Sequence, residues 1–566
     1  MSLEKQRPGA TLIPLILSSD KTQLTPFRGK TAYPVYLTIG NIPKDIRRKP
    51  SQHAQLLIGY IPTTRLEHMK NQTGRRRALA NLFHGCMDII LAPIKAHGET
   101  GIDMMSGDGV WHRCHPVLAA FVGDYPEQTL VTCTYGSRCP KCTVPTDQLG
   151  SLIEFPLRDA DKALDAYALA DGDATEFHAA CRTVGVKPIF HPFWESLPYS
   201  NIFISITPDV LHQLLQGVVK HLVSWLSKPC VFGPEEIDVR CRRLPPNHNF
   251  TPFPKGITTL SRVTGQEHKN MCRIVLGLVI DLPLPGGRSP IRLIRAIRAL
   301  LDFVYLAQYP SHTADTLSRL NDALSRFHDN KDIFIDLGAR THFNFPKLHS
   351  LIHYSSSITL FGSTDNYNTE QSERLHIDFA KDAYRATNRK DEYPQMTAWL
   401  ERREKIRRHA AYLQLSHEPN QLPKPIAMPT GPPLARTHVI KMTRYPSIYR
   451  VSYNDLAEKY GAHSFQDELG DFIALCKSTA GSAAAIRACG AETLIPFNTV
   501  PVYHRVRFTT RDQGYNNGEP EIVDAIQARP EQVDSQGRVV PARFDTVLVR
   551  NSSRSEHTIR GEWFIS

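Results

Sequence analysis

The sequence has no uninterrupted apolar run of about 18 residues, the length that a membrane-spanning helix requires. Its opening residues, MSLEKQRPGA, lack the hydrophobic core of a signal peptide. The 11 cysteines are odd in number and do not show the spacing of a disulfide framework. We also find no internal repeat and no long low-complexity tract. These absences argue against a membrane protein or a disulfide-rich secreted protein, and we expect a protein of the cytosol or nucleus.

The charge balance of the 566-residue chain is basic. It contains 67 Lys and Arg against 56 Asp and Glu, which gives a formal net charge of +11 at pH 7 and a pI near 9.0. Such an excess indicates an anionic partner, and nucleic acid is the first candidate. The alternative is a soluble protein whose surface simply carries many cations. The chain is long enough for about three domains, or for one large domain with an insertion.

The first part of the chain has the pattern of a mixed α/β domain. Apolar runs predict strands at 12–19, 31–40, 54–62, 109–124 and 128–135. A helix is expected around 76–98, between the third and fourth of these strands. Three strands, a helix and further strands indicate a mixed sheet covered by helices.

The middle of the chain has a helical pattern instead. Apolar residues recur at helical spacing in 208–226, 291–308 and 313–327. We therefore interpret these segments as parts of an all-helical block that is inserted into the α/β unit. Further helices are predicted at 369–388 and 394–413, where the α/β unit resumes.

The C-terminal part begins with a proline-rich stretch. Residues 417–435 contain six prolines and are expected to form an extended linker. Strands are predicted beyond it at 499–508 and 543–551, in a small β-rich module. The predicted segments are the α/β unit over 1–144 and 366–415, the helical insertion over 145–365, the linker over 416–445 and the β-rich module over 446–566.

Two carboxylates directly follow apolar runs. Asp20 ends the run LIPLILSSD, and Asp124 ends HPVLAAFVGD. Carboxylates at the ends of neighbouring strands can share Mg²⁺, which prefers hard oxygen ligands. A two-metal phosphodiester site needs a third acid, and Glu370 at the start of a predicted helix is available. The alternative is that the aspartates are turn residues and that Glu370 is a first-turn helix acid.

Cysteine and histidine pairs form two halves of a candidate zinc site. RCPKC contains Cys139 and Cys142, whose thiolates can reach one Zn²⁺ from a tight turn. KLHSLIHY contains His349 and His353, which are four residues apart and therefore share a helical face. Together they predict a Cys₂His₂ site that pins the end of the helical insertion to the α/β unit. The alternatives are ordinary reduced cysteines and two polar groups on a partly buried helix.

The motif PDVLH opens a predicted helix with Asp209 and His212. Asp209 follows Pro208 and can cap the helix, while His212 can hydrogen-bond a backbone group. The residues alone favour this structural interpretation.

Four long stretches, in order, resemble the catalytic region of DDE transposases of the CACTA (En/Spm-like) group, most closely the Plavaka-type fungal transposases. They are SSDKTQLTPFRGKTAYPVYLTIGNIPKDIRRKP, VLAAFVGDYPEQ followed by CPKC, ITPDVLHQLLQGVVKHLV, and NYNTEQSERLHIDFAKDAYRATNRKDEYPQM. The resemblance spans about residues 12–410 and extends more loosely into the tail. It implies an RNase H-like α/β core that is interrupted by an all-helical insertion before the last acidic helix.

The resemblance also implies catalytic residues. The two family aspartates match Asp20 and Asp124. The family glutamate matches Glu370, with Glu373 one turn further along the same helix in reserve.

The family's Asp-x-x-His signature matches Asp209 and His212. In this resemblance, His212 would position a phosphate or support a catalytic acid.

A cousin of the family, the V(D)J recombinase, supports the zinc prediction. It is similar in pairing a CxxC after the second aspartate with two histidines before the glutamate. The resemblance thus implies a structural Zn²⁺ held by Cys139, Cys142, His349 and His353.

The implied chemistry is phosphodiester hydrolysis followed by strand transfer. Three carboxylates would hold two Mg²⁺ (or Mn²⁺) ions, one to activate water or a DNA 3′-hydroxyl and one to stabilise the leaving oxygen. Basic segments would follow the backbone of double-stranded DNA, and their alternative is a solvated helix face. The candidates are Arg75, Arg76, Arg77, Arg402, Arg403, Lys405, Arg407 and Arg408.

The resemblance further implies transposon ends and target DNA as partners, a homo-oligomer, no membrane and a nuclear location. Such transposases carry an N-terminal DNA-binding region, whereas the first predicted strand here begins at residue 12. We therefore expect a truncated, decayed or domesticated copy that lacks this specificity module. Two rivals stay open. One is a catalytically inactive, transposase-derived DNA-binding protein, and the other is an RNase H-like nuclease that hydrolyses DNA without strand transfer.

Overall fold

The protein forms two compact units, Met1–Pro419 and Asn420–Ser566, in a computed structural model. The structure describes residues 2–25, 29–106, 109–245, 253–261, 263–417, 437–443, 445–477, 483–511, 522–533 and 537–544.

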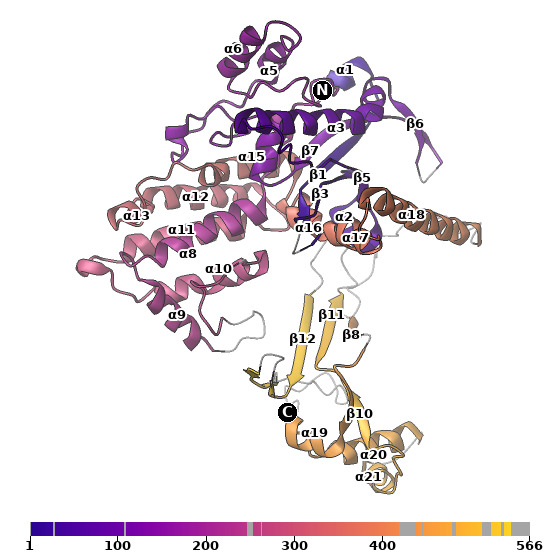
Figure 1. Ribbon diagram of the computed structural model, residues 1–566. Coiled ribbons are helices and arrows are strands. Elements are labelled where there is room, and N and C mark those ends of the chain that lie inside the picture. The colour runs from indigo at the N-terminus through magenta and orange to yellow at the C-terminus, as the bar shows by residue number, and fades with distance from the viewer. Residues whose placement is uncertain are drawn as a thin grey trace. The chain divides into compact units, whose positions relative to one another are not determined.

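A five-stranded sheet organises the α/β part of the first unit (Figure 1). Its strand order is β5-β4-β1-β7-β6, in which β1 and β7 run parallel and the other neighbours run antiparallel. The predicted mixed α/β class is therefore confirmed. The strands are β1 (Thr11–Ser19), β4 (Pro34–Ile39), β5 (Leu56–Tyr60), β6 (Ile102–Met105) and β7 (Trp111–Val122), and a short hairpin of β2 (Thr22–Gln23) and β3 (Thr31–Ala32) follows β1.

One face of the sheet is covered by α3 (Gln72–Thr100), whose Phe83 and Met87 are buried in one apolar cluster with sheet residues. The side chain of Asn71 caps this helix by accepting hydrogen bonds from two backbone N–H groups of the first turn. Near the other end, the carbonyl of Gly98 hydrogen-bonds the Nδ1 atom of His115 on β7 at 2.9 Å. Helix and strand therefore approach closely at that point.

The other face of the sheet is covered by a chain segment more than 300 residues away. Strand side chains alternate between faces, so Tyr36 points away from the α3 side, where its neighbour Val35 is buried. The Tyr36 ring lies 5.8 Å from the rings of His376 and Phe379. The covering elements are α16 (Thr369–His376), η7 (Ile377–Lys381), α17 (Asp382–Arg385) and α18 (Glu392–His417).

One strand prediction is wrong. Residues 128–135 were expected to form a strand, but α4 (Tyr125–Val131) covers the start of this stretch. Asp124 caps α4 and Pro126 lies in its first turn, and both are favourable helix-start residues. The first half of the run that suggested a strand, residues 128–131, instead belongs to a short helix, and a turn at residues 132–133 follows it.

The helices after α4 divide between two cores. Residues 163–206 pack in the same apolar cluster as the sheet, whereas a separate helical core begins at Val210. The independent helical block thus starts later than the expected residue 145. The helices are α5 (Ala160–Tyr167), α6 (Ala174–Val184), α7 (Ile202–Ser205), η3 (Val210–Val219), α8 (Lys220–Leu226), α9 (Pro234–Arg243), α10 (Gly265–Val279), α11 (Ile291–Leu306), α12 (Ala314–Asn330), α13 (Ile333–Asp336), α14 (Pro346–His349), η5 (Ser350–His353) and α15 (Tyr354–Phe361).

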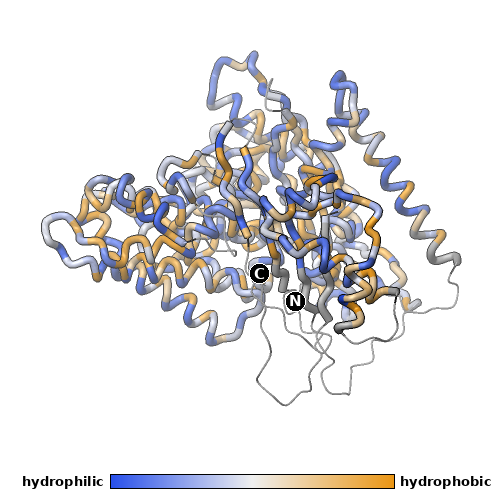
Figure 2. Tube along the Cα trace, turned by 90° about the horizontal axis from the view of Figure 1, so that it is seen from below, coloured by the Kyte–Doolittle hydropathy of each residue, from blue (hydrophilic) through white to orange (hydrophobic). Residues whose placement is uncertain are grey.

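Amphipathic periodicity explains this helical core. In α11, Leu293, Ile297, Leu300 and Val304 recur at spacings of three and four residues, and all four are fully buried. Helices of this part carry apolar residues on one side and polar residues on the other (Figure 2). The predicted helices at 208–226, 291–308 and 313–327 are therefore present, the first of them as η3 followed by α8.

The second unit is mixed rather than only β-rich, since it also contains three helices among its described residues. Its four-stranded sheet has the order β15-β12-β11-β8, and β8 lies inside the stretch 416–445 that was interpreted as a linker. Most of the proline-rich stretch 417–435 and the end of the predicted strand 543–551 lie outside the described residues. The elements are β8 (Thr437–Met442), β9 (Ile448–Ser452), α19 (Tyr453–Tyr460), α20 (Phe465–Lys477), α21 (Ala483–Ala491), β10 (Thr499–Val502), β11 (Arg505–Arg511), β12 (Ile522–Arg529), β13 (Gln532–Val533), β14 (Val539–Val540) and β15 (Arg543–Phe544).

Candidate active site and metal centre

The parallel pairing of β1 and β7 brings two predicted carboxylates to one edge of the sheet. Ser18 is in register with Val122, so Asp20 and Asp124 leave their strands side by side. Burial raises the pKa of Asp124 above its ordinary value, and the negative charge of Asp20 raises it further. A carboxylate whose ionisation is opposed by burial and by a neighbouring carboxylate is suited to sharing a cation with that neighbour.

A buried glutamate that the sequence did not single out joins these two strand ends. The backbone N–H of Glu127 donates to Asp124 at 2.9 Å. The Glu127 carboxyl accepts hydrogen bonds from the hydroxyls of Ser19 and Tyr33, the latter at 2.6 Å. Burial raises the pKa of Glu127 to about 8. A capping pattern at Asp124 was visible in the sequence, but the distant hydroxyls that bury Glu127 were not.

Asp209 and His212 form a tight pair beside these acids. Asp209 is fully buried and caps η3, and its Oδ2 atom lies 2.7 Å from Nδ1 of His212. The other ring nitrogen of His212 lies 3.2 Å from Glu373. Burial alone would lower the pKa of His212, but hydrogen bonds to the two carboxylates raise it to about 10. His212 is therefore a cation at neutral pH, and its charge acts on Asp124.

One face of α16 carries three side chains toward this cluster. Thr369 donates to Asp209 at 2.6 Å, Glu373 contacts His212, and Nε2 of His376 lies 3.3 Å from Asp20. These three residues are spaced at i, i+4 and i+7, so they share one helical face. His376 is buried and was another residue that sequence analysis missed.

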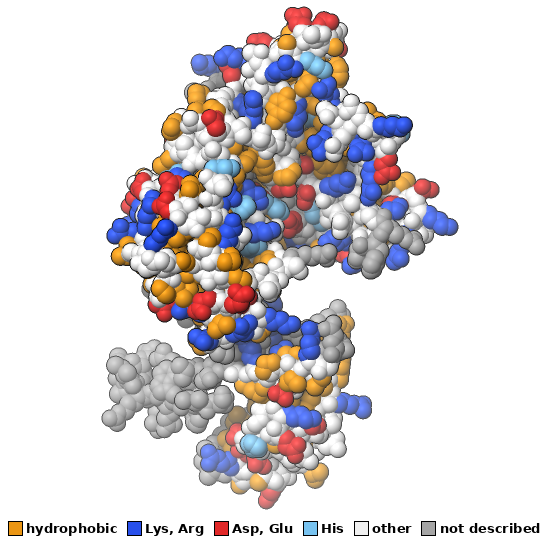
Figure 3. All heavy atoms as spheres, turned by 60° about the vertical axis from the view of Figure 1, so that its left-hand side comes forward, with side chains coloured by type: hydrophobic (Ala, Val, Ile, Leu, Met, Phe, Trp, Pro, Cys, Tyr) orange, Lys and Arg blue, Asp and Glu red, His pale blue; other side chains and the backbone are white. Residues whose placement is uncertain are grey.

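Glu370 lies on a different face of the same helix. Its carboxylate is 2.8 Å from Nζ of Lys269 on α10, and the amide of Asn368 donates to it at 3.1 Å. Its neighbour by one turn, Glu373, is the glutamate that faces the Asp209–His212 pair. The space-filling view shows acidic and histidine side chains gathered in a hollow of the first unit, with basic side chains around it (Figure 3).

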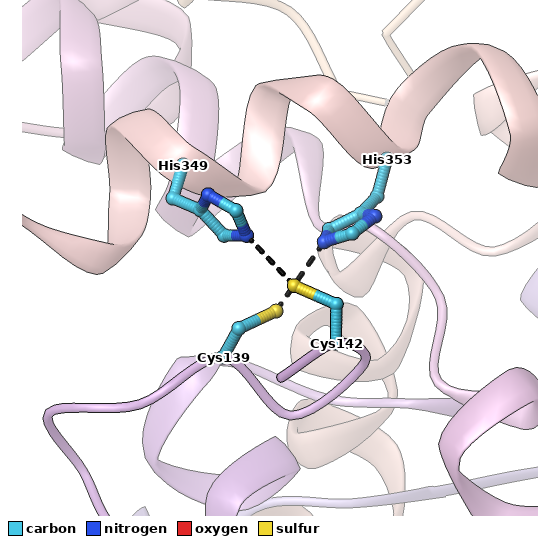
Figure 4. Close-up of side chains that lie close together, drawn as sticks. All are labelled: Cys139, Cys142, His349 and His353. Carbon is cyan, nitrogen blue, oxygen red and sulfur yellow. Dashed lines mark hydrogen bonds between the residues drawn. The ribbon is translucent and has the colours of Figure 1, made fainter. Parts of the chain in front are cut away.

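The predicted cysteine and histidine pairs meet in the structure (Figure 4). Their four ligand atoms all lie within 4.8 Å of one another. Sγ of Cys139 is 3.3 Å from Nε2 of His353, and Sγ of Cys142 is 3.1 Å from Nε2 of His349. Tetrahedral Zn²⁺ with ordinary Zn–S and Zn–N bonds would place its ligands about 3.3–3.8 Å apart, so the observed spacing fits such an ion.

The electrostatics of this cluster also fit a metal. Burial would raise the pKa of Cys139, but hydrogen bonds with Cys142 and both histidines bring it well below its ordinary value. The backbone N–H of Lys141 donates to the same sulfur at 3.3 Å, as expected for a thiolate held on a tight turn. The buried ammonium of Lys141 donates to the carbonyl of Ile206 at 2.7 Å. The cluster is thereby tied to the backbone just before Asp209.

Residues 1–226 match the family model described as Plavaka transposase. This match is consistent with a Plavaka-type transposase. None of the curated proteins matches the chain. The matched part contains Asp20, Asp124, the CxxC and the Asp209–His212 pair, and it ends before α16.

The match of residues 1–226 to the Plavaka transposase model confirms the predicted resemblance. It implies a nuclease- or transferase-type enzyme that acts on DNA and uses a divalent metal. Among the described residues, no helix combines the length and the apolar character that crossing a membrane requires.

The predicted basic residues fall on two helices, α3 and α18, that cover opposite faces of the sheet. Arg77 of α3 lies 3.1 Å from a ring nitrogen of His178, close to Arg75 and Arg76 in the first turns of the helix. The second group lies on α18 and consists of Arg402, Arg403, Lys405, Arg407 and Arg408. Within this group, Lys405 and Arg408 pair with glutamates of their own helix, whereas Arg403 lies over the Trp399 ring at 4.5 Å.

Proposed function

We propose that this chain is a DDE-type transposase that cuts and joins DNA with two Mg²⁺ (or Mn²⁺) ions at Asp20, Asp124 and Glu373. The observation that carries the proposal is the convergence of two parallel strand ends and one face of α16 on a single acidic cluster. Carboxylates from distant parts of the chain are costly to assemble without a cation to bind. A two-ion phosphodiester site provides that function.

The strand arrangement supports an RNase H-like core. Three antiparallel strands, β5, β4 and β1, are followed by the parallel β7. Near the carboxyl end of β7, Ile206 forms an isolated parallel bridge with Phe121, which adds one very short strand position beside β7. Asp209 follows this bridge, just as Asp20 and Asp124 follow their strands. In this proposal, the helical core that begins at Val210 is the insertion that separates this bridge from α16.

Glu373 replaces Glu370 as the proposed third acid. Glu373 shares its helical face with residues that contact Asp209 and Asp20, whereas Glu370 is paired with Lys269. Glu373 is also 43% exposed, which leaves its carboxylate free to turn from His212 toward a bound ion.

Each acid then has a defined role. Asp20, Asp124 and Glu373 would hold the divalent ions. When bound, these ions activate the attacking water or DNA 3′-hydroxyl and stabilise the leaving oxygen. Cationic His212, held in place by Asp209, is positioned to bind a non-bridging phosphate oxygen, and its charge offsets the repulsion between the acids.

We also propose that Cys139, Cys142, His349 and His353 hold a structural Zn²⁺. Four protein ligands leave no open coordination position, which is typical of structural zinc. The ion would fasten the loop after α4 to the end of the helical block and, through Lys141, to the strand end before Asp209.

A domesticated protein without catalytic activity is not favoured, because the acidic side chains still converge. Transposon ends and target DNA as partners, a homo-oligomeric assembly and a nuclear location all stay predictions.

The test uses the purified full chain, Mg²⁺ or Mn²⁺, and DNA duplexes with intact or pre-cleaved ends of the element that encodes it. We expect cleavage and joining by the wild-type chain, no reaction by Asp124→Asn, and a loss by Glu373→Gln that is much larger than the loss by Glu370→Gln. Activity that survives in Asp124→Asn would overturn the proposal. Cleavage without joining would indicate the rival nuclease.

A further inference from the structure

A strongly basic cavity of about 260 Å³ lies between the segment 47–55 and α18. Six Lys and Arg side chains line it against one acid, Asp378. We call it the Arg403 pocket, and its cationic residues are Arg47, Arg48, Lys49, Arg374, Arg403 and Arg407.

Some of these cations already have partners and hold the walls in place. The buried guanidinium of Arg47 donates to the backbone and side-chain oxygens of Asn366 at 3.1 and 2.7 Å. Arg48 pairs with Asp45 at 2.9 Å, and Arg374 pairs with Asp378 at 3.0 Å. These contacts are structural.

The other three cations lack an acidic partner within the described part of the chain. They are Lys49, Arg403 and Arg407. Arg403 is held over the Trp399 ring, and Arg407 donates to Nδ1 of His53 at 2.6 Å. Burial, together with the charges of Arg407 and Arg403, lowers the pKa of His53, so the ring is neutral and can accept this bond. The pocket therefore presents two oriented guanidinium groups, those of Arg403 and Arg407, that have no acidic partner among the described residues.

The pocket and the proposed active site lie on either side of one residue of α16. Arg374 lines both the Arg403 pocket and a second, more open cavity of about 350 Å³. That second cavity is also lined by Lys269 and by Glu373, the proposed third acid. Glu370 also lines this second cavity and pairs with Lys269, so Arg374 is the cation that stands between the proposed third acid and the Arg403 pocket.

We propose that the Arg403 pocket binds backbone phosphate of the DNA strand that enters the acidic cluster. This inference rests on the proposed function and adds a binding site to it. Phosphodiester groups are suited to guanidinium forks, and such contacts add affinity that depends on salt but not on sequence.

The test measures binding without catalysis. A short fluorescein-labelled DNA duplex of arbitrary sequence is titrated with the full chain in EDTA, at several salt concentrations, and anisotropy is read. We expect the double variant R403E/R407E to bind about tenfold or more weakly, with a salt slope lower by about one per lost contact. Lys49→Glu, on a different element, should weaken binding in the same direction.

The matched control is R298E/R319E, which makes the same change in net charge on α11 and α12. Both of these arginines are more than two-thirds exposed and pair with an aspartate of their own helix. Equal losses in the two double variants would show that only net charge matters and would overturn the proposal. Unchanged binding by R403E/R407E would overturn it as well.

Inorganic phosphate identifies the source of the ligand. Binding of inorganic phosphate to the wild type and to R403E/R407E is measured by calorimetry. If the variant loses phosphate binding but keeps the DNA affinity of the wild type, the pocket serves a free phosphate compound and the DNA proposal fails. Because binding is measured in EDTA, its outcome does not depend on cleavage. Loss of the proposed chemistry and loss of the proposed pocket are therefore separate results.

Discussion

The buried Glu127 makes a quantitative prediction about stability. Its pKa rises from an ordinary 4.5 to about 8 in the folded protein, mainly through burial. Each tenfold change in proton affinity is worth about 1.4 kcal/mol, so the full rise corresponds to about 5 kcal/mol. We expect Glu127→Gln, which stays neutral at every pH, to remove this dependence.

The sign follows from proton linkage. The folded state holds the proton of Glu127 more tightly than the unfolded state does, so its contribution to stability is fully present below about pH 4.5. That contribution is lost as the pH rises from about 4.5 through about 8, where folding must bury a carboxylate. Near pH 7 about 3 kcal/mol of it is already lost.

The assay is urea unfolding of the wild-type chain and of Glu127→Gln in EDTA, from about pH 5 to about pH 9. The stability of the variant relative to the wild type should increase steadily with pH. The same exchange at exposed Glu176 is the control and should give a flat difference. A flat difference for Glu127→Gln too would refute the reasoning, because it would mean that the carboxyl is ionised, or solvated, in the folded protein.

Three further outcomes are expected. Cys142→Ser should abolish stoichiometric zinc binding by the purified chain, as measured by elemental analysis, and should lower the melting temperature by several degrees. Zinc retained at the wild-type level would contradict the Cys₂His₂ assignment. Thr369→Val should lower the free energy of unfolding in urea by about 1–3 kcal/mol, because buried Asp209 loses a hydrogen-bond donor at 2.6 Å. An unchanged unfolding midpoint would mean that water replaces the hydroxyl. Gly98→Ala should destabilise by about 1–3 kcal/mol, because its Cβ would lie 2.5 Å from Cγ of Pro198; a neutral effect would show that this contact relaxes freely.

Apolar patterning predicted most of the sheet and the helical block. The runs before Asp20 and Asp124 became β1 and β7, and both acids lie just past the strand ends, as their position in the chain suggested. The spacing of two cysteines and two histidines predicted a cluster that the structure brings together over more than 200 residues. The strand ends and the short cysteine and histidine motifs can each be recognised within a few consecutive residues. Cysteine and histidine pairs at these spacings are typical of zinc sites.

The parts that sequence did not predict depend on tertiary contacts. Glu370 and Glu373 are both early residues of α16, and only the docking of that helix decides which of them faces His212. The role of Glu127 depends on hydroxyls 94 and 108 residues away. At 128–135, the capping of α4 by Asp124 overrode the strand preference of the apolar run.

The cysteine–histidine cluster closes a very long loop, since Cys142 and His349 are 207 residues apart. The free-energy cost of closing a flexible loop, which is entropic, rises by only about 0.6 kcal/mol for each doubling of the loop length. Helices of the closed segment that neither pack on the sheet nor hold Asp209 and His212 can therefore be gained, lost or lengthened at little cost to the junction. Evolution is free to reshape that region while the chain still re-enters the α/β core at the same place.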